Sequence, residues 1–87
     1  MLYLVCYELK RPNQDYDSLY AAIEGIGNNI HATTSHWFVQ TSLSAAQIYG
    51  RLKPHIDDND YIFVTSVGHD RQGWLPQKVW DWIDSHS

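Results

Sequence analysis

Glu8 is the residue whose type and position point most directly to chemistry. It stands near the end of Leu2–Leu9, an otherwise almost continuous apolar run. Burying a carboxylate is costly unless it is paired with a cation or bound to a metal. Glu8 is therefore either a metal ligand, doubled by symmetry in a dimer, or a carboxylate at a solvated strand end that pairs with Lys10 or Arg11.

Other polar groups give weaker signals. The acidic turn Asp57–Asp60 offers oxygen ligands of the kind that a hard cation prefers, but it lacks the Gly and the distal Glu of an EF-hand loop, which favours a solvated turn. The histidines do not have the spacing of a zinc site. His31 and His36 fall on or near one hairpin, where a general base is one interpretation and a structural histidine the favoured one.

The stretch 68–74 combines an acid, a base and a cation in one loop. Loops often carry binding sites, although any solvated connection has a similar composition. Arg71 belongs to this loop. Cys6 lies in the middle of the first apolar run, where a free thiol is expected to be a small buried apolar group.

Composition limits the classes of function. The 87 residues correspond to one domain, residues 1–87, with a thin core. Aromatic residues make up 14% of the chain, so we expect some rings at the surface, where they mark a partner surface. The net charge of −4 disfavours non-specific nucleic-acid binding. A single cysteine excludes an intrachain disulfide, and no apolar run is long enough for a membrane span, so we expect a cytoplasmic protein.

Hydrophobic periodicity and turn residues predict the elements that position these groups. We expect strands at 2–9, 30–33, 36–41 and 61–67, and helices from Asp15 to Gly27, from Ser42 or Ser44 to Ile56, and from Leu75 to His86. The order predicts an α+β fold, a ferredoxin-like βαββαβ two-layer sandwich with an extra C-terminal helix. The core is expected at 2–67, and the C-terminal loop and helix at 68–87.

In this fold both core helices pack on one face of the sheet, so the other face is left uncovered. Tyr3, Val5 and Tyr7 share a face of the first strand because side chains alternate with period two. We expect this face to be the uncovered one. Dimerisation through these three residues, or cover from the C-terminal helix, would remove their apolar side chains from water.

The chain resembles two related families over about residues 2–67. The resemblance rests on 4–9, on Ser35-His36-Trp37 in the hairpin, and on Ile56–Val64. One family is the small bacterial SinR family, to which 41–48 and 52–57 look especially similar. The other is the CRISPR-associated adaptation family known as Cas two, together with VapD-like toxins.

The resemblance implies a ferredoxin-like homodimer. In the adaptation family, an acidic residue follows an aromatic one at the end of the first strand. Paired across the dimer axis, it is proposed to hold a divalent metal for phosphodiester cleavage. Tyr7 and Glu8 occupy that place here, with Glu where the family has Asp. The Arg-rich first helix of the family has no counterpart in 16–27.

Two functional hypotheses follow. The first is a dimeric nuclease that cleaves RNA or DNA with Mg²⁺, with Glu8 as the metal ligand and catalytic residue. The second is a non-catalytic dimeric module that binds a protein partner. A third interpretation, a small-ligand regulator, requires a pocket at a dimer seam. The residues expected to contribute to binding are Tyr7, Arg11, His36 and Arg71.

Overall fold

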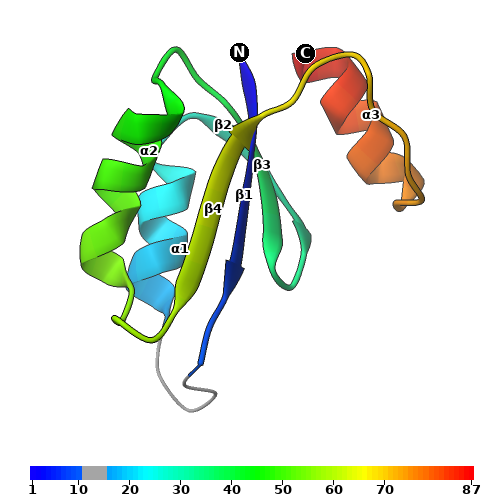
Figure 1. Cartoon of the computed structure of the whole chain (residues 1–87). Coiled ribbons are helices and arrows are strands. Elements are labelled where there is room, and N and C mark those ends of the chain that lie inside the picture. The colour runs from blue at the N-terminus through cyan, green and yellow to red at the C-terminus, as the bar shows by residue number, and fades with distance from the viewer. Residues whose placement is uncertain (11–15) are drawn as a thin grey trace.

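The computed structural model describes residues 1–10 and 16–87 (Figure 1). The elements along the chain are β1 (Leu2–Glu8), α1 (Asp17–Glu24), β2 (Asn28–Thr33), β3 (His36–Gln40), α2 (Ala45–Leu52), the 3₁₀ turn η1 (Lys53–His55), β4 (Tyr61–Ser66) and α3 (Gln77–His86). The order β-α-β-β-α-β confirms the predicted α+β, ferredoxin-like fold with an extra C-terminal helix. Arg11 and the cap proposed at Asp15 lie outside the described residues.

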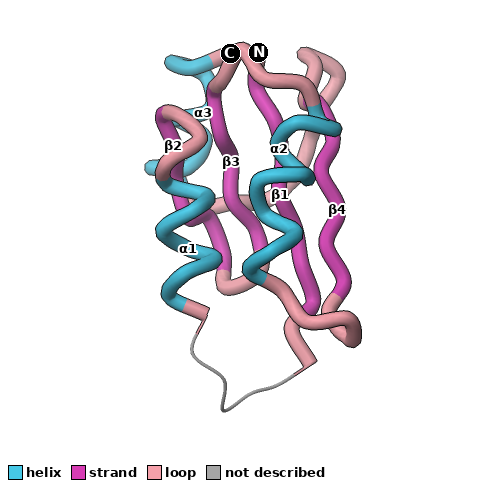
Figure 2. Tube along the Cα trace, turned by 90° about the vertical axis from the view of Figure 1, so that its left-hand side faces the viewer, coloured by secondary structure: helices cyan, strands magenta, loops and turns pink. Residues whose placement is uncertain are grey.

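The described strands form one antiparallel sheet in the order β2-β3-β1-β4, with β1 and β3 in the middle (Figure 2). β1 pairs with both of its neighbours, so Val5 lies opposite Trp37 on one side and Val64 on the other. Trp37 in turn lies opposite His31 on β2. The two edges of the sheet are therefore β2 and β4.

Helices α1 and α2 cover one face of the sheet, here called the inner face (Figure 1). Leu19 and Ile23 of α1 and Ile48 and Leu52 of α2 are fully buried against it. The β1 residues that meet them are Tyr3, Val5 and Tyr7, at 6%, 0% and 7% exposure. The expectation that these three residues form an open sheet face is therefore wrong, because the face they share is the one that the two helices cover.

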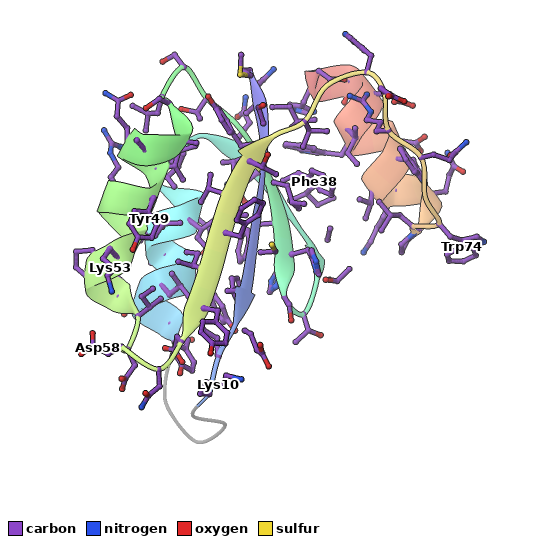
Figure 3. The ribbon with its side chains drawn as sticks, in the orientation of Figure 1. Lys10, Phe38, Tyr49, Lys53, Asp58 and Trp74 are labelled. Carbon is purple, nitrogen blue, oxygen red and sulfur yellow. The ribbon has the colours of Figure 1, made fainter. Side chains whose placement is uncertain are left out.

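Helix α3 packs on the opposite, outer face. Val79 and Ile83 form a second buried cluster with Leu2, against which Phe38 also packs. Phe38 projects from the sheet toward α3 (Figure 3). Seen from the inner face, α3 lies behind β2 and away from β4 (Figure 2). Cover from the C-terminal helix thus exists, but on the outer face, where α3 packs over β2, over Phe38 of β3 and over Leu2 at the start of β1.

Local signals in the sequence explain the second helix. The helix begins after Ser44, one of the two expected starts, and Ser44 and Gln47 form a capping box: the Gln47 amide donates to Ser44 Oγ, and Gln47 Oε1 accepts from the Ser44 amide. Pro54 stands in the 3₁₀ turn that ends the helix, because proline has no N–H for a helical hydrogen bond. Ile48 and Leu52 form the buried face of this helix, whereas Tyr49 is 41% exposed.

Gly27 has a packing role between α1 and β2. A Cβ atom built on it would lie 2.1 Å from the carbonyl oxygen of Gln40. Any side chain here would push the start of β2 away from the end of β3. Among residues 1–10 and 16–87, no helix combines the length and apolar character needed to cross a bilayer.

Candidate functional site

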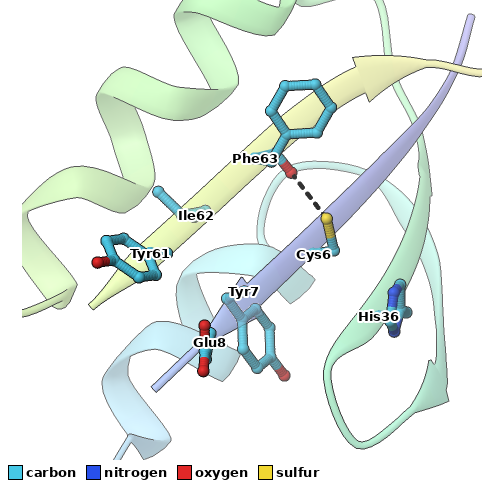
Figure 4. Close-up of a pocket in the computed structure, with 7 residues that line it drawn as sticks. All are labelled: Cys6, Tyr7, Glu8, His36, Tyr61, Ile62 and Phe63. Carbon is cyan, nitrogen blue, oxygen red and sulfur yellow. Dashed lines mark hydrogen bonds between the residues drawn. The ribbon is translucent and has the colours of Figure 1, made fainter. Parts of the chain in front are cut away.

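The outer face is uncovered at the Glu8 end of β1 and at the Tyr61 end of β4. Alternation and register place Cys6 beside His36 and Phe63, and Glu8 beside Tyr61, on this face. These five residues, here called the open patch, line an open hollow of about 280 Å³ (Figure 4). The sequence pointed to an uncovered sheet face, and the structure places it on the even-numbered residues of β1.

Two aromatic rings dominate the open patch. Tyr61 is 64% exposed and Phe63 is 63% exposed. They stand two residues apart on β4, so their side chains leave the same face of the strand. Exposed apolar residues are unremarkable one at a time, whereas a contiguous group marks a contact surface.

Glu8 is exposed and paired within its own chain. Its side chain is 65% exposed, and Lys10 Nζ donates to Glu8 Oε1 at 2.9 Å. This hydrogen bond is the main cause that raises the pKa of Lys10, whose ammonium also lies 5.0 Å from the centre of the Tyr61 ring. The structure confirms the alternative in which Glu8 pairs with Lys10.

The predicted metal site at Glu8 can be compared with the ligands that a single chain provides. Mg²⁺ is usually bound through one or two carboxylates with several waters, while Ca²⁺ takes six to eight oxygens. The described residues contain no group of three or more His, Cys, Asp or Glu side chains that could hold a metal. At this end of β1, a single chain thus provides one exposed carboxylate, that of Glu8, which is paired with the Lys10 ammonium.

Cys6 and His36 face each other across β1 and β3 but lack the features of a thiolate–imidazole pair. Cys6 is only partly buried, not the fully buried group that the sequence suggested. Its Sγ lies 3.7 Å from the Phe63 carbonyl oxygen, and burial raises the pKa of the thiol. His36 Nδ1 is engaged with Thr33 Oγ1 at 2.8 Å. A protonated thiol is a poor nucleophile.

Tyr7 was predicted as a binding residue and lies beneath the helices instead. Trp37 Nε1 donates to Tyr7 Oη at 2.9 Å, and Tyr7 Oη donates to the Thr34 carbonyl at 3.1 Å. Burial raises the pKa of Tyr7 to about 12. His31 stacks on Trp37 at 4.1 Å between ring centres. Tyr7 thus hydrogen-bonds to the hairpin turn, and His31 packs on the buried Trp37 ring.

Asp60 has a structural role that the sequence did not reveal. It is 7% exposed, although the acidic turn was expected to be solvated. Its carboxylate accepts from the backbone amides of Lys10 and Asp57, each at 2.8 Å, and from Tyr16 Oη at 3.2 Å. Through Asp60, the turn before β4 is therefore hydrogen-bonded both to Lys10 after β1 and to Tyr16 at the start of α1.

Arg71 lies apart from the open patch, in the connection that leads to α3. Its guanidinium donates to the Gly68 carbonyl at 3.0 Å and to Ser87 Oγ at 2.8 Å, and it lies 3.4 Å from Asp84. Its side chain is only 17% exposed. Arg71 also borders a second, apolar hollow of about 300 Å³ between α3 and the sheet, next to Phe38.

No family model matches this chain, and no curated protein is similar to it. The resemblance to the SinR and Cas two families therefore stays a prediction. Of the predicted site residues, the structure brings Glu8 and His36 to the open patch and places Tyr7 in the core. Tyr61 and Phe63 were missed as site residues, although two rings at period two in the last core strand were a readable signal.

Proposed function

We propose that the protein is a non-catalytic interaction module that works as a homodimer, with the β4 edge of its sheet and the exposed rings of Tyr61 and Phe63 at the contact with a second copy. The observation that supports this proposal is the exposure of Tyr61 and Phe63, at 64% and 63%, on a sheet face that α3 leaves open. Covering an apolar side chain of this size contributes about 1.5–3 kcal/mol when burial is complete. A two-fold dimer brings both copies of each ring to one contact, and partial cover of each ring contributes a fraction of that amount.

The size of the domain supports the same proposal. A chain of 87 residues has a thin core, and self-association is a common additional source of stability at this size. Four buried residues of α1 and α2 pack on the inner face, whereas on the outer face Val79 and Ile83 of α3 leave Tyr61 and Phe63 of β4 exposed. A second copy at the β4 edge would give Tyr61 and Phe63 neighbours that the monomer lacks.

The nuclease hypothesis makes a different demand on the same surface. Two Glu8 carboxylates would have to leave their Lys10 partners and meet at one metal ion across the dimer axis. Leaving an exposed ion pair costs little, since such pairs contribute only about 0–1 kcal/mol. The separation of the two Glu8 residues in the dimer therefore decides between the two hypotheses.

Sedimentation velocity over a wide range of concentrations tests the proposal. We expect the wild type to dimerise and Phe63→Ser to be shifted toward monomer. Trp74→Ser is the matched control, because Trp74 is 90% exposed and points away from the body of the molecule (Figure 3). A wild type that stays monomeric, or a Phe63→Ser protein that dimerises like the wild type, would overturn the proposal.

A nuclease assay completes the test. Labelled RNA and DNA are incubated with the wild type and with Glu8→Ala, in Mg²⁺ and in EDTA. The proposal expects no metal-dependent cleavage by either protein. Cleavage that requires Mg²⁺ and is lost in Glu8→Ala would replace the non-catalytic module by a metal-dependent nuclease.

A further inference from the structure

The unpaired edge of β4 has a defined set of hydrogen-bonding groups. The Val67 amide donates to the Leu2 carbonyl of β1 at 2.8 Å. The same type of pair recurs at every second residue, where Leu4, Cys6 and Glu8 of β1 lie opposite Thr65, Phe63 and Tyr61 of β4. In an antiparallel ladder, a residue directs both its N–H and its C=O to the same side. Tyr61, Phe63 and Thr65 therefore bond to β1, while the backbone groups of Ile62, Val64 and Ser66 point away from the sheet.

The opposite pattern on β1 supports this assignment. The Met1 carbonyl accepts from Thr41, and the Tyr7 amide donates to Ser35. Odd-numbered residues of β1 thus turn toward β3, which leaves the even-numbered residues for β4. The direction of every backbone group in β4 follows from these contacts.

The edge of β4 carries none of the usual protection against pairing. Protected edges use charged side chains, proline or bulges. The sequence Tyr61–Ser66 has no charged residue and no proline, and its register with β1 is continuous. The other edge strand, β2, has an irregularity between His31 and Thr33, and α3 packs beside it. Only the β4 edge is regular and unprotected among the described strands.

We propose that β4 pairs antiparallel with β4 of a second copy, about a two-fold axis that passes through Val64. This inference rests on the proposed homodimer and specifies how it forms. Val64 then lies opposite Val64 of the second copy, and Ile62 opposite Ser66. The two-fold axis adds the symmetric pair of Ser66 with Ile62. All three pairs are of the hydrogen-bonded type, and they exchange about six hydrogen bonds. The two four-stranded sheets become one continuous sheet.

The side chains are complementary in this register. On the outer face, Phe63 lies opposite Thr65 of the second copy, and Tyr61 lies opposite Val67. Pairs of aromatic with β-branched residues are among the favourable cross-strand pairs. The register therefore gives both exposed rings of the open patch a β-branched neighbour, and it brings no two like charges together within β4.

The same register keeps the two Glu8 residues apart. They are separated by three inter-strand steps of about 4.8 Å and by six residues of about 3.4 Å along the strand, since Glu8 pairs with Tyr61. The resulting distance is about 25 Å. No single metal ion reaches both carboxylates, so this dimer excludes a shared metal at Glu8.

Cysteine cross-linking tests the axis. In a Cys6→Ala background, Val64→Cys meets its own copy with Cα atoms about 5.5 Å apart, within the range of a disulfide. Ile62→Cys is the matched control, because it lies on the same face but about 14 Å from its own copy. We expect oxidation with diamide to give a covalent dimer at position 64 and little at position 62. Equal cross-linking at both positions would overturn the register.

Amide hydrogen exchange of the wild type provides a test without substitutions. We expect Ile62, Val64 and Ser66 to gain protection as the concentration rises through the dimer range, while Phe63 and Thr65 stay protected throughout. A dimer that lacks both the cross-link and this protection overturns the β4 pairing but leaves the homodimer in place. A protein that is monomeric at every concentration overturns both proposals.

Discussion

Ser66→Pro tests the backbone contribution to the proposed dimer. Ser66 is exposed at the end of β4, and its N–H points away from β1, so proline removes no hydrogen bond of the monomer sheet. In the dimer, the Ser66 N–H donates to the Ile62 carbonyl of the second copy. The two-fold axis repeats this bond, so one substitution removes two.

The magnitude follows from the net value of a hydrogen bond, about 0.5–1.5 kcal/mol. Two lost bonds weaken the dimer by about 1–3 kcal/mol, which raises the dissociation constant about 5- to 150-fold. The assay is sedimentation equilibrium at several concentrations. Ser66→Ala is the control, because it deletes the hydroxyl and keeps the N–H, and it should dimerise like the wild type.

Thermal unfolding at low concentration separates this effect from a damaged monomer. The melting temperature of monomeric Ser66→Pro should lie close to that of monomeric wild type. If Ser66→Pro is folded and dimerises as strongly as Ser66→Ala, the Ser66 N–H does not face a partner strand and the reasoning on β4 is refuted.

Three further predictions concern the fold. The pKa of Tyr7 is raised from 10.0 to about 12, so the unfolded chain loses this proton at a lower pH than the folded one. The free energy of unfolding should therefore fall between about pH 10 and pH 12, and it should fall less in Tyr7→Phe. Urea titrations at each pH would measure both. Gly27→Ala forces a Cβ into the Gln40 carbonyl and should cost about 1–3 kcal/mol in denaturant unfolding; an unchanged midpoint would contradict the close approach. Asp60→Asn weakens the charged acceptor of the Lys10 amide and should cost about 1.5–3 kcal/mol, and an equally stable variant would remove its anchoring role.

The element order was predictable because each element carries its own local signal. Turn residues separate the strands, and the capping box at Ser44 and Gln47 marks a helix start. The face of β1 that the helices cover was not predictable, because both faces are apolar: Tyr3, Val5 and Tyr7 on one, Leu2 and Leu4 on the other. Period two groups residues by face, but the choice of face depends on packing with distant segments.

The candidate site was predictable in part for the same reason. Glu8 and its pairing with Lys10 are local in sequence, and both were anticipated. The burial of Asp60 depends on Tyr16 and Lys10, which are 44 and 50 residues away. The contacts of Arg71 with Asp84 and Ser87 likewise require α3 to fold back. Such long-range pairs leave no periodic trace in the sequence.

The Asp60 carboxylate has a consequence for engineering of this domain. It accepts hydrogen bonds from the Lys10 amide and from Tyr16 Oη, so the two residues that flank 11–15 are both bonded to one carboxylate. The entropy of closing a loop grows only slowly with its length once the ends are held. A recognition peptide or a protease site inserted between Lys10 and Tyr16 should therefore leave the sheet intact, which makes this position a natural graft point.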